Sequence, residues 1–393
     1  MDPRPIPGED WDLAPDFLTV NHGSYGAVPR SVAAAQAAWR RRVEAQPSRF
    51  MVAELPGALR NAAARLAGFI GADAEGLGFV ANATEGCNAV LRGLDLAPGD
   101  AILLLSHGYG AVRKAAGFVA ARAGARVEEV ALPFPRPDEA GVLAALDAAL
   151  DGPGGPRVRL AVLDHITSPS GLVLPVAAMA ALCRARGVAV LVDGAHAPGQ
   201  VPLDVGAIGA DWYTGNAHKW LFAPRGCGFL WTAPARRAAT HPVVISHGLG
   251  AGYAAEFDWT GTRDPSPFLA IGAALAAHAR LGGPALMARN RALAAGAGAL
   301  LAARLGTEAG ALPAMQGAMG VVRLPVDGSA ADALALRRRL LALGTDAPVM
   351  AVGGALWLRL SAQAYNGATD YARLGDLVAR VIQSETHRAP PVC

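Results

Sequence analysis

The residues with the clearest chemical potential are a lysine and the groups around it. The chain has only two lysines, and Lys219 lies in Asp211–Trp220, directly after the apolar run Trp212–Thr214 and beside His218. A lysine held among apolar groups deprotonates more easily, so its amine can act as a nucleophile. A surface lysine with a packed apolar stem gives the same pattern. Lys219 alone therefore leaves both interpretations open.

Two further segments supply the partners that such a lysine would need. Asp193 ends the apolar run Val188–Asp193, where its carboxylate can face a cationic ring nitrogen, as in pyridoxal-phosphate sites. Asn82–Gly86 comes after another apolar run and opens a helix, whose amides, with the Thr84 hydroxyl, could bind a phosphate. Each feature alone also fits a simple helix cap. No GxxxxGK[ST] or GxGxxG motif is present, so nucleotide-binding alternatives lack their phosphate cradles.

The elements that must position these residues are short apolar runs that alternate with alanine-rich amphipathic stretches. Such alternation predicts a mainly parallel sheet covered by helices, in which ligands bind beyond the carboxyl ends of the strands. The expected strands are Leu77–Val80, Ala101–Leu105, Arg126–Ala131, Val158–Asp164, Val188–Asp193, Trp212–Thr214 and Gly228–Trp231. The expected helices between them are Gly86–Leu94, Ala111–Ala123, Gly141–Leu150 and Val176–Arg186.

The chain is expected to divide into an N-terminal segment and two domains. Residues 1–30 would contribute to the active-site entrance, residues 31–250 would form the large domain, and residues 251–393 would form a small α+β domain. The small domain is expected to contain helices Pro267–Leu281 and Pro284–Leu305 and strands Gly320–Leu324 and Ala355–Leu360.

Composition narrows the class of protein. The formal net charge is only +3 and is spread without basic blocks, which argues against a nucleic-acid partner. No run is long and apolar enough for a transmembrane helix, and no signal peptide is recognisable, so no membrane partner is expected. The four cysteines show no paired spacing, which is typical of a reducing compartment. The sequence therefore predicts a cytoplasmic protein.

Seven motifs in order resemble the fold-type I pyridoxal-phosphate enzymes of the class V aminotransferase superfamily, and most of all the isopenicillin N epimerases and their relatives. The motifs are Asn21–Gly26, Asn82–Gly86, His165–Gly171, Val192–Gly199, Tyr213–Leu221, Trp259–Thr262 and Trp357–Asn366. The resemblance implies the fold-type I transferase fold, with a mainly parallel seven-stranded sheet and a small C-terminal α+β domain. It also implies pyridoxal 5′-phosphate as the cofactor, an amino acid as the substrate and a homodimer.

The resemblance also implies the roles of individual residues. Lys219 would form a Schiff base with the cofactor and move the substrate's Cα proton, and Asp193 would pair with the pyridinium nitrogen. Tyr109 would stack on the cofactor ring, and Arg359, with Ser24, would hold the substrate carboxylate. The remaining cofactor-binding residues are His196 and Ser168 near the phenolic oxygen, Ala83, Thr84, Asn216 and His218 around the phosphate, and Thr262 reaching the partner subunit's phosphate.

The sequence predicts Cα deprotonation better than it predicts the fate of the carbanion. Epimerisation or racemisation is expected first, a β-eliminating carbon–sulfur lyase second and transamination third. Inversion needs an acid on the face opposite Lys219, for which Tyr109, Tyr213 and His107 are the candidates. Persulfide chemistry of the cysteine desulfurase type is not expected, because residues 344–354 contain no cysteine. No metal is expected, because the histidines lack ligand spacing.

Overall fold

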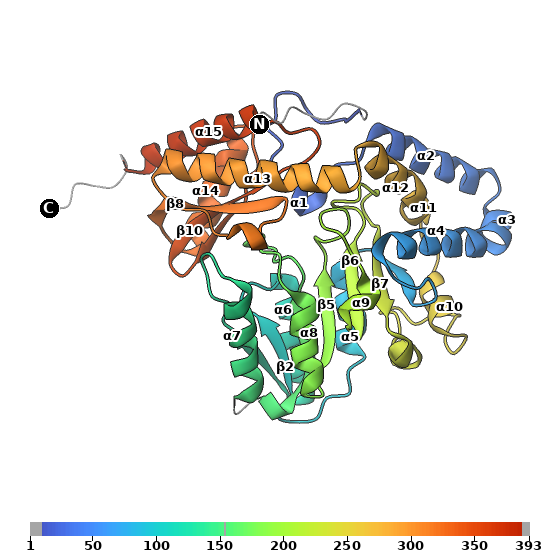
Figure 1. Ribbon diagram of the computed structural model, residues 1–393. Helices are drawn as coiled ribbons and strands as arrows, with labels where there is room; N and C mark the ends of the chain where they lie inside the picture. Colours follow the sequence, from blue (N-terminus) through green and yellow to red (C-terminus); the bar gives the residue numbers. More distant parts are fainter. Residues whose placement is uncertain (1–9, 153–154, 387–393) are drawn as a thin grey trace.

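The computed structural model describes residues 10–152 and 155–386 and shows a helix-covered sheet with a smaller sheet beside it (Figure 1). Long apolar runs with both faces buried form the central strands, as a sheet covered on both sides requires. The strands of the large sheet are β1 (Leu77–Val80), β2 (Ala101–Leu105), β3 (Arg126–Val130), β4 (Val158–Asp164), β5 (Ala189–Gly194), β6 (Trp212–Asn216) and β7 (Gly228–Thr232).

The strand order brings the functional segments to one edge of the sheet. The order is β1-β7-β6-β5-β4-β2-β3, with β7 antiparallel to both neighbours and the other pairs parallel. The carboxyl ends of all strands except β7 therefore point the same way. The expected mainly parallel seven-stranded sheet is confirmed.

Helices cover both faces of this sheet. The face that carries Val162 of β4 and Leu191 of β5 packs against three helices. These are α5 (Ala83–Arg92), α6 (Gly110–Ala123) and α10 (Tyr253–Asp258). The opposite face, with Leu163 and Val192, belongs to the largest apolar cluster. Helices contributing to that cluster are α2 (Arg30–Ala45), α4 (Leu55–Ile70), α7 (Glu139–Asp151), α8 (Val176–Ala185), α9 (Val205–Ile208), α11 (Ser266–Leu269) and α12 (Ile271–Arg280).

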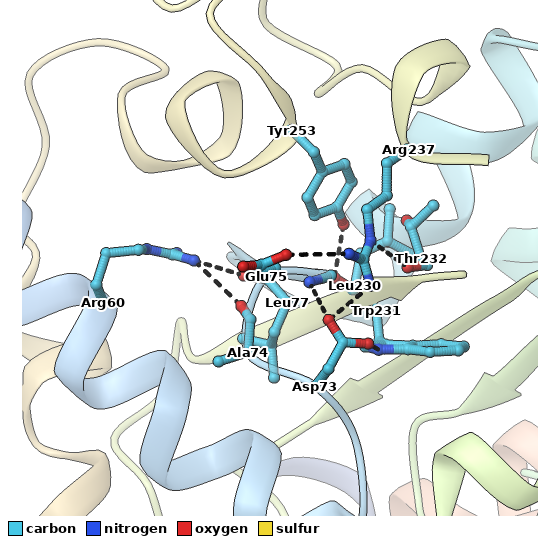
Figure 2. A network of polar contacts seen from close by, with 11 residues as sticks. Arg60, Asp73, Ala74, Glu75, Leu77, Leu230, Trp231, Thr232, Arg237 and Tyr253 are labelled. Atoms are coloured by element: carbon cyan, nitrogen blue, oxygen red, sulfur yellow. Dashed lines mark hydrogen bonds and ion pairs between the residues drawn. The ribbon is translucent and has the colours of Figure 1, made fainter. Parts of the chain in front are cut away.

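A polar network fixes the β1–β7 edge of the sheet (Figure 2). Asp73, before β1, accepts hydrogen bonds from the Trp231 indole at 3.1 Å and from Arg237 at 2.5 Å. Arg60 of α4 donates to the carbonyl of Leu77 at 3.1 Å, and the Tyr253 hydroxyl of α10 donates to the carbonyl of Leu230. These contacts join α4 and α10 to the antiparallel pair of β1 and β7, of which β1 leads into the Asn82–Gly86 turn.

The C-terminal part of the chain builds the second sheet. It contains β8 (Met319–Asp327), β10 (Ala355–Ser361) and β9 (Val349–Val352), in that order and antiparallel, with helices α13 (Pro284–Leu305), α14 (Ala330–Ala342) and α15 (Ala368–Thr386). Figure 1 shows this unit at the upper left of the large sheet. Its apolar cluster includes Leu18 and Val20, so the chain before α1 (His22–Tyr25) packs on the C-terminal sheet.

Two expectations about elements need correction. The single helix expected over Pro267–Leu281 is two helices, α11 and α12, separated at Ala270. Strand β9 was not expected; it is only four residues long and is followed directly by Gly353 and Gly354. The division at residues 30 and 250 stays a prediction, and residues 1–9 and 387–393 of the outer segments lie outside the described residues. In the described ranges no single helix is long and apolar enough to span a membrane. The segment of α11 and α12 together with α13 meets the same length and hydropathy criteria only as a pair bent by 67°.

Candidate active site

A cavity of about 440 Å³ opens at the carboxyl edge of the large sheet. Ten of the residues expected from the sequence line it: Ser24, Ala83, Thr84, Tyr109, Ser168, Asp193, His196, Asn216, His218 and Lys219. They come from the carboxyl ends of β5 and β6, from the segments that follow β1, β2, β4, β5 and β6, and from α1. The strand order thus assembles residues that are far apart in the sequence.

Lys219 lies among buried groups that favour its neutral form. Burial, and secondarily the charge of Arg359, lowers the pKa of its amine to about 8, while Asp193 opposes this shift. Its Nζ lies 3.3 Å from Nε2 of His196. Burial holds the pKa of His196 well below the usual value, so the imidazole is neutral and can accept from the lysine. The amine is therefore available as a nucleophile near neutral pH.

The backbone of Lys219 is held by the N-terminal motif. His22 donates from Nε2 to the carbonyl of Lys219, and the Tyr365 hydroxyl donates to Nδ1 of His22, both at 3.0 Å. Burial lowers the pKa of His22 to about 4, which keeps the ring neutral. Gly26 has a φ of 71°, and a Cβ there would lie 2.1 Å from the carbonyl oxygen of His218. Only glycine fits this close approach.

The start of α5 lines the cavity. Asn82 caps the helix by accepting from the amide of Glu85 at 3.0 Å. The Ala83 amide donates to Oδ1 of Asn216 at 2.8 Å. The Thr84 amide is one of the first-turn amides that an α-helix leaves without an internal acceptor. A helix start of this kind favours a bound phosphate.

Arg359 lies behind the cavity wall as a buried cation with neutral partners. It is 4% exposed and donates to the carbonyl of Ser168, to Oδ1 of Asn21 at 3.0 Å and to the Ser24 hydroxyl at 2.7 Å. Its Nε has no hydrogen-bond partner in the described structure. Burial lowers the pKa of its guanidinium to about 10, so it remains charged at neutral pH. A buried cation with neutral partners favours a carboxylate ligand.

Besides Arg359, three expected residues do not line this cavity. Tyr213 is fully buried, and its hydroxyl contacts Nδ1 of His165 at 2.9 Å. The register pairs Asp193 with Thr214, so Tyr213, one residue away, projects to the other face of the sheet. His107 contacts Ser170 instead, at 2.8 Å. Thr262 is exposed in the loop before α11 and does not line the cavity of its own chain.

The cavity is also lined by residues to which the sequence analysis assigned no role. Asp164 at the end of β4 is the chief of these, together with Tyr25, Asn82, Ala111, Ile166 and Ala195. The available signal for Asp164 was its position at the end of an expected strand. The local sequence pattern does not show that this strand, β4, lies beside β5, which carries Asp193. The described residues contain no cluster of three or more His, Cys, Asp or Glu suited to a metal.

The residues of the cavity fit pyridoxal 5′-phosphate. The fit rests on an amine of lowered pKa, a buried carboxylate and a helix start, all facing one cavity. Lys219 would hold the cofactor covalently, Asp193 would face its ring nitrogen, and the start of α5 would bind its phosphate.

Comparison with protein families decides the assignment. The family model described as "Aminotransferase class-V" matches residues 27–339. The chain belongs to the class-V aminotransferase family. Its cofactor is pyridoxal 5′-phosphate, as the sequence predicted.

Relatives of the chain carry two different activities in their names. It is 39% identical to "Putative L-cysteine desulfhydrase 1" of Oryza sativa subsp. japonica, over 92% of this chain and 83% of the relative. It is 36% identical to isopenicillin N epimerase of Streptomyces clavuligerus, over 93% of this chain and 97% of the relative. The solved complex of the cystine C–S lyase C-DES with cysteine persulfide has a TM-score of 0.76 and 24% identity, covering 93% of this chain and 97% of that one. This likeness shows the fold.

Proposed function

We propose that the chain catalyses β-elimination of a sulfur substituent from a small cysteine-type amino acid. The observation that carries this proposal is that Lys219 is the one amine facing the cavity within the described structure, while only Tyr109 of the three expected second acids lines it. Elimination needs one proton-transferring group, whereas inversion by two opposed groups needs a second. The L-cysteine desulfhydrase relative supports the same choice.

The side chains of this site would divide the work between binding and proton transfer. Arg359 binds the substrate's α-carboxylate, while Lys219 Nζ accepts the proton from Cα. The bound cofactor supplies an electron sink for the Cα carbanion. The Cβ–S bond then breaks with the electron pair going to sulfur, and the Lys219 ammonium can return its proton to the departing thiolate. With L-cysteine and water, the overall products are pyruvate, ammonia and hydrogen sulfide.

Asp193 and His196 set the charge around Lys219. The Asp193 carboxylate would face the ring nitrogen of the bound cofactor and favour its protonated form, which would strengthen the electron sink. Neutral His196 accepts a hydrogen bond from the lysine without adding charge. The amine therefore alternates between base and acid near neutral pH.

Epimerisation is the second candidate function. It is supported by the epimerase relative and by Tyr109, which lines the cavity and is 46% exposed. A tyrosine hydroxyl on the face opposite Lys219 would supply the second acid. The proposal of a homodimer, in which exposed Thr262 reaches the partner's phosphate site, applies to either reaction. The cytoplasmic location stays a prediction.

The test is product analysis with the holoenzyme and L-cysteine. We expect sulfide and pyruvate in equal amounts, with both lost in Lys219→Ala and kept in Lys114→Ala. Lys114 is a fair control because it is the only other lysine and is exposed on α6. Recovery of D-cysteine with its C–S bond intact, without sulfide, would favour the epimerase instead. An essential acid–base role for Tyr109 would make Tyr109→Phe lose about 100-fold or more in rate.

A further inference from the structure

Two carboxylates occupy neighbouring strand ends in the cavity. Asp164 ends β4, Asp193 lies near the end of β5, and the parallel register pairs the two residues directly. They are 5% and 4% exposed, and both line the cavity. Paired residues on adjacent strands project to the same face, so these side chains share one desolvated space.

Backbone amides hold each carboxylate separately. Ala195 donates to Oδ1 of Asp193 at 3.0 Å. The amide of Tyr109 donates to Asp164. The turn before Tyr109 is close-packed on this carboxylate, because a Cβ at Gly108 would lie 3.2 Å from Oδ2 of Asp164. Asp164 is therefore a fixed part of the cavity wall.

The charges around the pair are unequal. The positive charge of Lys219 favours the ionised form of Asp193. The charge of Arg113 on α6 favours the ionised form of Asp164, but its effect on the pKa of Asp164 is the weakest one. Arg113 is itself occupied by Glu129 and by the carbonyls of Leu105 and Ser106. The better-compensated carboxylate is thus Asp193.

No other group that faces the pair in the described part of the chain supplies a positive charge. Burial and both carboxylates keep the pKa of Cys87 on α5 well above its usual value. Burial and Asp193 do the same to the pKa of Tyr213, whose side chain projects from β6 to the other face of the sheet. Both groups are therefore neutral. Burial, followed by the charge of Asp193, raises the pKa of Asp164 well above its usual range.

We propose that Asp164 is a positioning residue of the cofactor site that carries a proton beside ionised Asp193. Two adjacent buried carboxylates cannot both ionise without a large cost, so one of them retains its proton. The pair then presents one negative charge, which matches the single positive charge of a protonated ring nitrogen. Through its other contact, Asp164 fixes the backbone of Tyr109 at the cavity mouth. The inference depends on the cofactor and applies equally to elimination and epimerisation.

Infrared difference spectroscopy tests the proton directly. The holoenzyme at neutral pH is expected to show the carbonyl stretch of a protonated carboxylic acid, and Asp164→Asn is expected to lose it. Asp100→Asn is the matched control, because Asp100 is buried but paired with Arg157 and Arg159 at 3.4 and 3.1 Å. This control should keep the band. Persistence of the full band in Asp164→Asn would overturn the proposal.

Cofactor binding gives a second, independent readout. Asp164→Asn removes no negative charge if Asp164 is protonated, so its cofactor affinity should fall less than that of Asp193→Asn, which removes the counter-charge. An equal fall in both variants would overturn the proposal. If Asp164→Asn does not fold, a pH titration of the wild-type infrared band suffices. The band should be present at neutral pH and disappear as the pH rises, and its absence at neutral pH would be a contradiction.

Discussion

Replacing Arg359 with lysine keeps the buried positive charge but removes the planar guanidinium. In the structure this group is held by the Ser168 carbonyl, Asn21 and Ser24, all neutral. The nearby carboxylate of Asp346 is engaged by Arg337 at 2.7 and 2.8 Å and by Asn21. The substrate carboxylate is therefore expected to be the counter-ion of Arg359.

The size of the effect can be worked out from the hydrogen bonds at stake. An ammonium cannot reproduce two parallel hydrogen bonds to a carboxylate. Loss of one charge-assisted hydrogen bond costs about 1.5–3 kcal/mol. At ~1.4 kcal/mol per tenfold, Arg359→Lys should lower kcat/KM by about 10- to 150-fold. Most of the loss should appear in KM, because the carboxylate is bound throughout the reaction.

Steady-state kinetics of sulfide release from L-cysteine measures this effect. The cofactor absorbance of the variant provides a check that the site is loaded. Arg237→Lys is the matched control, because it makes the same chemical change in the network at the β1–β7 edge (Figure 2). An unchanged kcat/KM in Arg359→Lys would refute the assignment of Arg359 to the carboxylate.

Three other outcomes are expected. The rate at which the apoprotein takes up cofactor should rise with pH with a midpoint near 8, because the Lys219 amine must lose its proton to react. A midpoint near 10.5, the ordinary lysine value, would contradict the lowered pKa. Gly26→Ala should unfold at lower denaturant concentration than wild type, because its Cβ would meet the carbonyl of His218; an unchanged midpoint would disprove this close contact. Mixing inactive Lys219→Ala with an inactivating Thr262 variant should restore some activity through heterodimers, whereas a fully active monomer would disprove the shared site.

Local patterns were sufficient to predict much of the fold. Continuous apolar runs identified the buried strands, and β1, β2 and β4 match their expected bounds. The position of a lysine and an acid after two such runs was enough to suggest one site, because parallel strand ends share an edge. The side chains confirm that Lys219 and Asp193 line one cavity.

Features set by register and packing could not be predicted in this way. Tyr213 precedes Lys219 closely in the sequence, but strand alternation directs it to the opposite face from Thr214. In the sequence, Asp164 looks like any other acid at the end of a strand. Only the strand order shows that it lies beside Asp193. The break at Ala270 is likewise invisible in an alanine-rich run, since α11 and α12 both pack against α2 and α4.

The most direct test of the site is to locate the lysine that holds the cofactor. Borohydride fixes the cofactor permanently to that lysine, and peptide mapping by mass spectrometry then identifies the residue. The geometry of the cavity predicts modification of buried Lys219 and none of exposed Lys114. Modification of Lys114, or the same modification and colour in Lys219→Ala without added amine, would contradict it.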